Sequence, residues 1–108
     1  MKMHAAGIGD YVMRNRVVEF ELNRSIGWEP TPWDEAAVVA SGLPPGTSQG
    51  YTWTFRLVPE GPGVTLVTET FDCADASADI RQAVHDGADW IGSMTATLER
   101  LDRMCRPA

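Results

Sequence analysis

Glu69 is the residue of this sequence best placed for proton transfer, because it stands in an apolar, β-branched stretch, VTLVTETF at residues 64–71. Burial in such surroundings disfavours the charged form of a carboxyl group and raises its pKa, as a general acid or base requires. A glutamate that faces solvent from the same strand is the alternative. Which of the two applies depends on the register of the strand.

Ser48 lies in a Gly-x-Ser-x-Gly pattern at residues 46–50, and Asp72 and His85 follow it in the chain order of a hydrolase triad. The nucleophile elbow of those enzymes needs a buried strand before the serine and a helix after it. Here two prolines precede the pattern, and a strand pattern begins at Tyr51 directly after it. We therefore expect a loop at this position, without a nucleophilic serine.

The candidate metal ligands are few and widely spaced. Cys73 and Cys105 form no C-x-x-C pair, and His4 and His85 stand about eighty positions apart. Zinc and other transition-metal sites need clustered cysteine and histidine ligands. The Gly-x-Gly at residues 7–9 has no third glycine and therefore does not indicate a phosphate-binding loop. The sequence predicts no metal site and no cofactor.

Length and charge narrow the class of protein. The chain has 108 residues, 44% of them hydrophobic, which suits a single domain over residues 1–108. Its 9 Lys plus Arg against 15 Asp plus Glu give a net charge of -6, which disfavours nucleic acid and anionic membrane surfaces as partners. No long apolar run and no signal-peptide pattern are present, so we expect a cytoplasmic protein.

Aromatic residues are dense for so short a chain. Most of them must belong to the core. Indole rings also line apolar ligand cavities well, because the ring is apolar and its N–H finds a polar contact. The aromatic residues considered for core or cavity are Trp28, Trp33, Trp53, Trp90, Phe55, Phe71 and Tyr51.

The first half of the chain predicts a hairpin followed by a long connection. Residues 11–22 alternate as a strand does, and residues 26–29 form a short return strand. Residues 30–50 are rich in proline and glycine. Within them we expect about two helical turns, capped by Thr31 and ended by Gly42. This connection is either an ordered surface excursion or a lid over a pocket.

The second half predicts another hairpin and a long helix. Strict alternation at residues 51–57 indicates a strand, and residues 64–71 its antiparallel partner. If odd-numbered positions of the two strands pair, Glu69 shares a face with Trp53 and Phe55. If the register is slipped by one residue, Thr68 and Thr70 share that face instead. A short helical segment at 79–85 and a break at Asp86 and Gly87 come next. We expect Asp86 to cap an amphipathic helix over residues 88–105.

Three stretches together resemble the SRPBCC superfamily, the START-like helix-grip proteins that include polyketide cyclases and dehydrases. They are RVVEFELNRSIGWEP, GYTWTFRLVPEGPGVTLVTETFD and WIGSMTATLERLDRM. The resemblance covers roughly residues 11–105, the C-terminal two-thirds of that family. It implies an α+β fold in which an antiparallel sheet wraps around a long C-terminal helix. The first strand and two small helices of the family have no counterpart before Met1.

In this family a cavity between sheet and helix holds an apolar ligand. The resemblance therefore implies that the chain binds a small hydrophobic molecule there. Any chemistry would be aldol-type cyclisation or dehydration of a polyketide-like substrate, with Glu69 as the proton shuttle. The residues expected to line the cavity are Trp53, Phe55, Val67, Glu69, Phe71, Trp90 and Met94.

Two other functions fit the same residues. A carrier or sensor of a lipid or aromatic metabolite uses the cavity without chemistry, and an assembly module has a filled core and no pocket. A buried carboxyl group with a shifted pKa would favour catalysis, whereas a cavity with purely apolar walls would favour a carrier or sensor. We also expect a homodimer, formed by pairing of strand edges or by exchange of the N-terminal hairpin, because part of the family's cover is missing.

Overall fold

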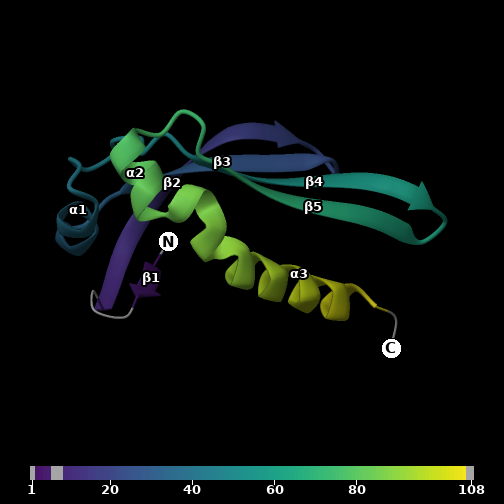
Figure 1. Cartoon of the computed structure of the whole chain (residues 1–108). Helices are drawn as coiled ribbons and strands as arrows, with labels where there is room; N and C mark the ends of the chain where they lie inside the picture. Colours follow the sequence, from purple (N-terminus) through teal and green to yellow (C-terminus); the bar gives the residue numbers. More distant parts are fainter. Residues whose placement is uncertain (1, 6–8, 107–108) are drawn as a thin grey trace.

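The computed structural model describes the backbone of residues 2–5 and 9–106, in which one antiparallel sheet is followed by helices (Figure 1). Its strands run in chain order across the sheet and are β1 (Lys2–Ala5), β2 (Gly9–Glu21), β3 (Ser25–Pro32), β4 (Thr52–Gly61) and β5 (Val64–Asp72). The helices are α1 (Glu35–Ser41), α2 (Ala78–Ala83), the 3₁₀ helix η1 (His85–Trp90) and α3 (Ile91–Cys105). The chain is therefore an α+β protein with an antiparallel sheet and a C-terminal helix, as the sequence predicts.

The strand β3 is longer than the sequence indicates, because it continues through two prolines. Pro30 and Pro32 pair with Asn15 and Met13 of β2, whereas the pairing of β3 with β4 stops at Trp28. Beyond Trp28, β3 is thus an edge strand, where proline is tolerated. The carbonyl of Pro32 accepts a hydrogen bond from the Gly46 N–H at 2.8 Å and so points away from β2. The proline nitrogens face this free edge, where the ladder needs no donor.

The helix α1 has the expected length but a different cap. Asp34, and not Thr31, is its N-cap, and the Asp34 carboxylate accepts a hydrogen bond from the Ala37 N–H at 2.9 Å. Thr31 is buried within β3, where its hydroxyl donates to the Arg14 carbonyl. Gly42 ends the helix as predicted, with a φ of 72° that suits glycine. The prediction that Thr31 caps this helix was wrong, because β3 extends through Thr31 and the helix begins later.

The register of the second hairpin puts odd positions opposite one another. Trp53 pairs with Phe71, Phe55 with Glu69, and Leu57 with Val67. Residues directly opposite in an antiparallel pair point to the same face of the sheet. Glu69 therefore shares a face with Phe55, the first of the two arrangements that the sequence allows.

A sharp kink separates α2 from α3. Ser77 caps α2 through a hydrogen bond from the Ile80 N–H, and the backbone then turns through residues with positive φ at His85, Asp86 and Gly87. The break is where the sequence predicts it. Asp86 does not cap α3, however: its carboxylate accepts a hydrogen bond from Arg81 at 2.9 Å, and α3 begins only at Ile91.

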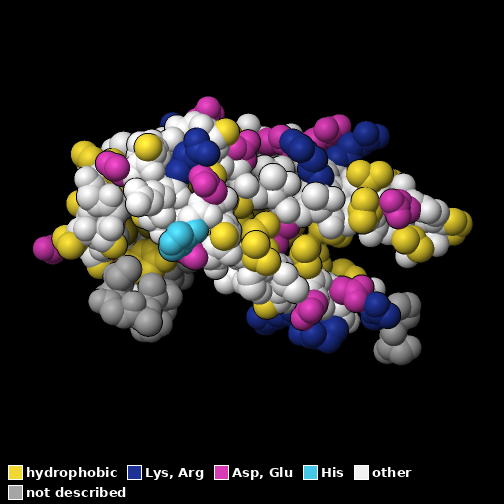
Figure 2. Space-filling view, viewed as in Figure 1, with side chains coloured by type: hydrophobic (Ala, Val, Ile, Leu, Met, Phe, Trp, Pro, Cys, Tyr) yellow, Lys and Arg dark blue, Asp and Glu magenta, His cyan; other side chains and the backbone are white. Residues whose placement is uncertain are grey.

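The two faces of the sheet differ in chemistry. We call the face toward η1 and α3 the inner face; its strand residues are mostly apolar, and the polar ones include Asn15, Thr65 and Glu69. The opposite, outer face carries ion pairs such as Arg56 with Glu19. Helix α1 packs on β2 and β3, whereas α3 packs mainly on β5 and leaves a gap lined by hydrophobic side chains (Figures 1 and 2). The best-buried residues lie at the α1 end, and they include Met13, Thr31, Pro32 and Ala37.

Candidate functional site

A pocket of about 340 Å³ lies where α1 and η1 meet the inner face of the sheet. Strands β2, β3 and β4 form its floor, α1 forms one wall, and Trp90 of η1 forms another. Gln49, from the connection before β4, completes the rim. The pocket is lined by Tyr11, Met13, Asn15, Trp28, Pro30, Ala37, Ala40, Ser41, Gln49, Tyr51, Trp53 and Trp90.

Strand alternation explains why these side chains converge. Tyr11, Met13 and Asn15 are every second residue of β2, so they point to one side of the sheet. The register brings Pro30 opposite Asn15, and it brings Trp28 of β3 opposite Trp53 of β4. Three adjacent strands thus contribute the same face to one site.

A cluster of aromatic rings holds the deep wall of the pocket. The ring of Phe71 lies 4.8 Å from that of Trp53, 5.2 Å from that of Tyr51 and 6.3 Å from that of Trp90. Trp53 and Trp90 meet edge to face at 5.9 Å. Such tilted and edge-on contacts are favourable for aromatic pairs. Phe71 therefore supports three residues of the pocket lining, Tyr51, Trp53 and Trp90.

Gly87 sets the distance between the kink and this cluster. A Cβ atom at Gly87 would lie 2.7 Å from Cδ2 of Phe71, closer than carbon atoms approach. Its φ of 93° is also a conformation that favours glycine. The kink therefore packs backbone directly against Phe71 and places Trp90 over the pocket.

Two residues of the pocket lining each carry a polar side-chain atom that is buried without a hydrogen-bond partner among the described residues. These atoms are the Oδ1 acceptor of Asn15 and the Nε1–H donor of Trp90. A buried polar group without a partner costs roughly 1–3 kcal/mol. Burial also raises the pKa of Tyr51 to about 12, so its hydroxyl stays neutral at physiological pH. The pocket is thus mostly apolar, and two of its lining residues hold one acceptor and one donor without a partner.

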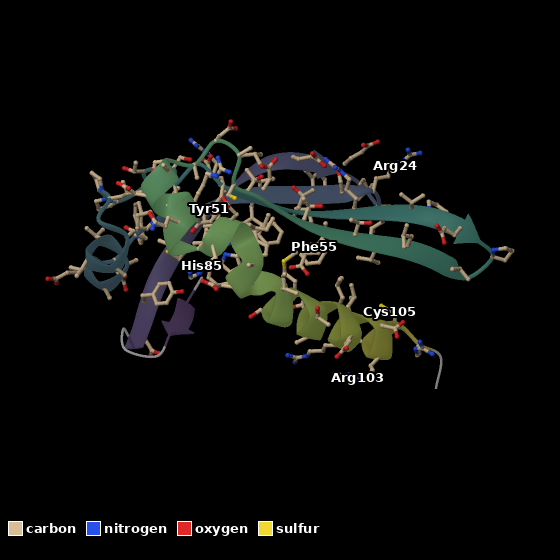
Figure 3. All side chains as sticks on the ribbon, in the orientation of Figure 1. Arg24, Tyr51, Phe55, His85, Arg103 and Cys105 are labelled. Atoms are coloured by element: carbon tan, nitrogen blue, oxygen red, sulfur yellow. The ribbon has the colours of Figure 1, made fainter. Side chains whose placement is uncertain are left out.

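Glu69 lies on the inner face but outside the lining of this pocket. Its Oε2 atom is buried and has no hydrogen-bond partner among the described residues, and burial raises the pKa of its carboxyl group. Phe55, directly opposite, stacks on Trp28 with ring centres 5.8 Å apart. Figure 3 shows Phe55 between the sheet and α3. Glu69 is therefore partly withdrawn from water on the inner face, and it does not line the pocket.

The site residues predicted from the sequence fall into two groups. Trp53 and Trp90 line the pocket, and Phe71 supports it. Phe55, Glu69 and Val67 lie on the inner face farther along the hairpin, and Met94 is half-buried on α3. The prediction missed the contributions of β2, β3 and α1. The signal that could have found them is the long connection at residues 30–50, which fits a lid as well as a surface excursion.

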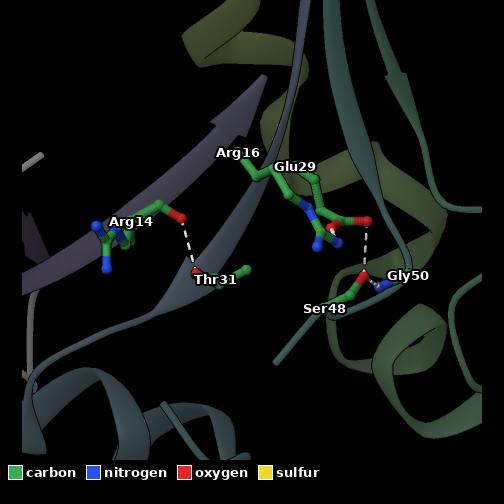
Figure 4. Close-up of polar contacts among 6 residues, drawn as sticks. All are labelled: Arg14, Arg16, Glu29, Thr31, Ser48 and Gly50. Atoms are coloured by element: carbon green, nitrogen blue, oxygen red, sulfur yellow. Dashed lines mark hydrogen bonds and ion pairs between the residues drawn. The ribbon is translucent and has the colours of Figure 1, made fainter. Parts of the chain in front are cut away.

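Ser48 is held on the outer face by a carboxylate (Figure 4). Its hydroxyl donates a hydrogen bond to Oε2 of Glu29 at 2.8 Å, and it accepts one from the Gly50 N–H at 3.1 Å. Arg16 binds the other oxygen of Glu29, and the hydrogen bond from Ser48 is the main reason that the pKa of Glu29 is lowered. The pattern around Ser48 is a loop, as predicted, and His85 pairs instead with Asp89.

Comparison of the chain with protein-family models, with curated proteins and with solved structures finds no match. The resemblance to the SRPBCC superfamily therefore stays a prediction. Among the described residues, no three His, Cys, Asp or Glu side chains gather as metal ligands would. No helix in the same part of the chain is both long and apolar enough to cross a bilayer.

Proposed function

We propose that this protein binds a small, uncharged and largely apolar molecule in the pocket between α1, η1 and the inner face. Its volume of about 340 Å³ lies within the range of small-molecule sites, which are concave, mostly apolar and equipped with a few polar groups. The observation that carries the proposal is the pair of buried, unpartnered atoms, Asn15 Oδ1 and Trp90 Nε1, on two residues of a mostly apolar lining.

These two atoms define the chemistry of the ligand. Asn15 Oδ1 accepts a hydrogen bond, and Trp90 Nε1 donates one. The described residues that line the pocket include no Asp, Glu, Lys, Arg or His, so a charged ligand would lose its hydration without compensation. An aromatic or alicyclic molecule with a hydroxyl group, alone or with a carbonyl, meets these requirements.

Carriage or sensing of such a molecule fits the pocket better than catalysis within it. The described lining contains no Asp, Glu, His, Cys, Lys or Arg, and burial raises the pKa of its Tyr51 to about 12. A proton-transfer reaction at neutral pH needs a group whose pKa lies near 7. The lining offers orientation and shelter from water, which are what a binding protein requires.

Proton transfer by Glu69 is the second candidate function, and the buried, unpartnered Oε2 of that residue favours it. The cyclase or dehydrase chemistry implied by the SRPBCC resemblance would then take place in the gap between β5 and α3. The helix-grip arrangement that we propose for the fold is supported by the apolar inner face and by the course of α3 along it (Figure 1).

Calorimetric titration with 1-naphthol, a bicyclic ring with one hydroxyl group, tests the proposal. We expect 1-naphthol to bind and naphthalene-1-sulfonate, its charged analogue, to bind at least tenfold more weakly. Ala40→Phe places a ring in the pocket from α1 and should weaken 1-naphthol binding at least tenfold. Val39→Phe is the matched control, because the neighbouring Val39 is 76% exposed and does not line the pocket. Equal affinity of both variants for 1-naphthol would refute this site.

A further inference from the structure

Three apolar side chains of the inner face, on β2 and β3, are left exposed, because α3 packs mainly on β5. Val17 is 58% exposed, Phe20 66% and Ile26 40%. The register joins them, because Phe20 pairs with Ile26, and Val17 pairs with Trp28 beside it. We call these three residues the open inner face. We propose that a second copy of this chain packs over it, open inner face against open inner face.

The chain exposes more surface area than a compact monomer of its mass, as a subunit of a dimer would. A compact monomer of 11.8 kDa exposes about 5,900 Å² and has a radius of gyration of about 13 Å. This chain exposes 7702 Å² and has a radius of gyration of 15.5 Å. The excess is roughly 1,800 Å², whereas a stable interface buries about 800 Å² on each partner. The excess, which is a property of the whole chain, is therefore larger than the area that one contact between two copies needs.

The distribution of charge selects this face over the outer one. Two chains with a net charge of -6 each repel one another unless their charged groups stay outside the interface. The ion pairs of Arg16 with Glu29 and of Arg56 with Glu19 lie on the outer face, away from the open inner face. A twofold axis brings an apolar patch against its own copy and needs no complementary charge.

The inner face also accounts for the exposed residues better than pairing of strand edges does. Addition of a strand at the β5 edge would extend the sheet but would leave Phe20 and Val17 in water. Packing of the inner faces removes them from water, and each Å² of apolar surface that is buried contributes roughly 25 cal/mol. Trp28, which lines the ligand pocket, lies next to Val17 across the β2–β3 pair, so the contact adjoins the pocket.

Sedimentation equilibrium of the full chain between 5 and 100 µM tests the proposal. We expect a mass near twice 11.8 kDa. Phe20→Asp should shift the chain to a monomer over this range, because it buries a charge in the contact. Val58→Asp is the matched control, since Val58 is 51% exposed and opposite Leu66 on the outer face, and this variant should stay dimeric. Circular dichroism establishes that each variant is folded; if Phe20→Asp is unfolded, Val17→Glu takes its place.

Each outcome decides the question. A wild-type monomer that unfolds cooperatively at these concentrations would overturn the proposal, and the open inner face would then be left to a partner of another kind. A dimer that persists in both Phe20→Asp and Val17→Glu would overturn it too, because the contact would lie elsewhere, for example at the β5 edge. Dissociation of Val58→Asp to the same extent would show a general effect of charge and not an interface at this face.

Discussion

Replacement of Gly87 by alanine should destabilise the protein more than the same change at another glycine with a similar backbone. An alanine at a positive φ costs roughly 1–2 kcal/mol, because its Cβ approaches the following carbonyl. At Gly87 the new Cβ also lies 2.7 Å from Cδ2 of Phe71, a ring fixed by contacts with Tyr51, Trp53 and Trp90. Because that ring has little room to move, overpacking adds roughly 1–3 kcal/mol.

Gly63 is the matched control for this experiment. Its φ of 71° is also positive, but a Cβ there would meet no atom within 4 Å. Gly63→Ala should therefore lose only the backbone contribution, and Gly87→Ala roughly 2–5 kcal/mol in total. Thermal unfolding measures the difference, since 1 kcal/mol corresponds to roughly 4 °C in a domain of this size. Gly87→Ala should also weaken 1-naphthol binding, because Trp53 and Trp90 move with Phe71. Equal losses of Tm in the two variants would refute the role given to the Gly87–Phe71 contact.

Glu69→Gln should make the protein more stable than wild type at pH 7, and this advantage should vanish below the ordinary glutamate pKa of about 4.3. The sign follows because burial raises the pKa of Glu69, so the folded state holds the proton more tightly and wild type loses stability as pH rises. Denaturation at pH 3.5 and pH 7 checks this, and an advantage independent of pH would contradict it. Trp90→Phe removes an unpartnered donor but keeps a ring, so it should leave Tm almost unchanged and weaken 1-naphthol binding about threefold to tenfold. Calorimetry measures the affinity, and an unchanged affinity would rule out Trp90 as the donor to the ligand.

Periodicity predicted the elements of this fold well. The alternation at residues 51–57 is strict enough to assign Trp53 and Phe55 to one face, and the structure places both on the inner face. The register of the opposing strand was beyond prediction. Both faces of residues 64–71 carry β-branched side chains, so the pattern alone does not decide whether Glu69 or Thr68 points inward.

The location of the pocket depends on contacts that no local pattern reveals. The family resemblance directs attention to the space between the sheet and the C-terminal helix, whereas the pocket forms where α1 crosses β2 and β3. Long-range packing decides whether α1 covers a pocket or lies on the surface. The sequence of residues 30–50 does not reveal that packing. Asn15 is the clearest example of a site residue that the sequence does not reveal. A single polar residue in a strand is usually interpreted as solvent-facing, and only its neighbours in the fold show otherwise.

The prolines of β3 also bear on how this protein avoids aggregation. An exposed strand edge attracts strands from other molecules, because its free N–H and C=O groups continue the sheet. Beyond Trp28, β3 has no strand beside it on one side, but this edge is covered: Pro30 and Pro32 are buried, their nitrogens carry no N–H, and the Pro32 carbonyl is already bonded to Gly46. An incoming strand finds neither the donors nor this acceptor.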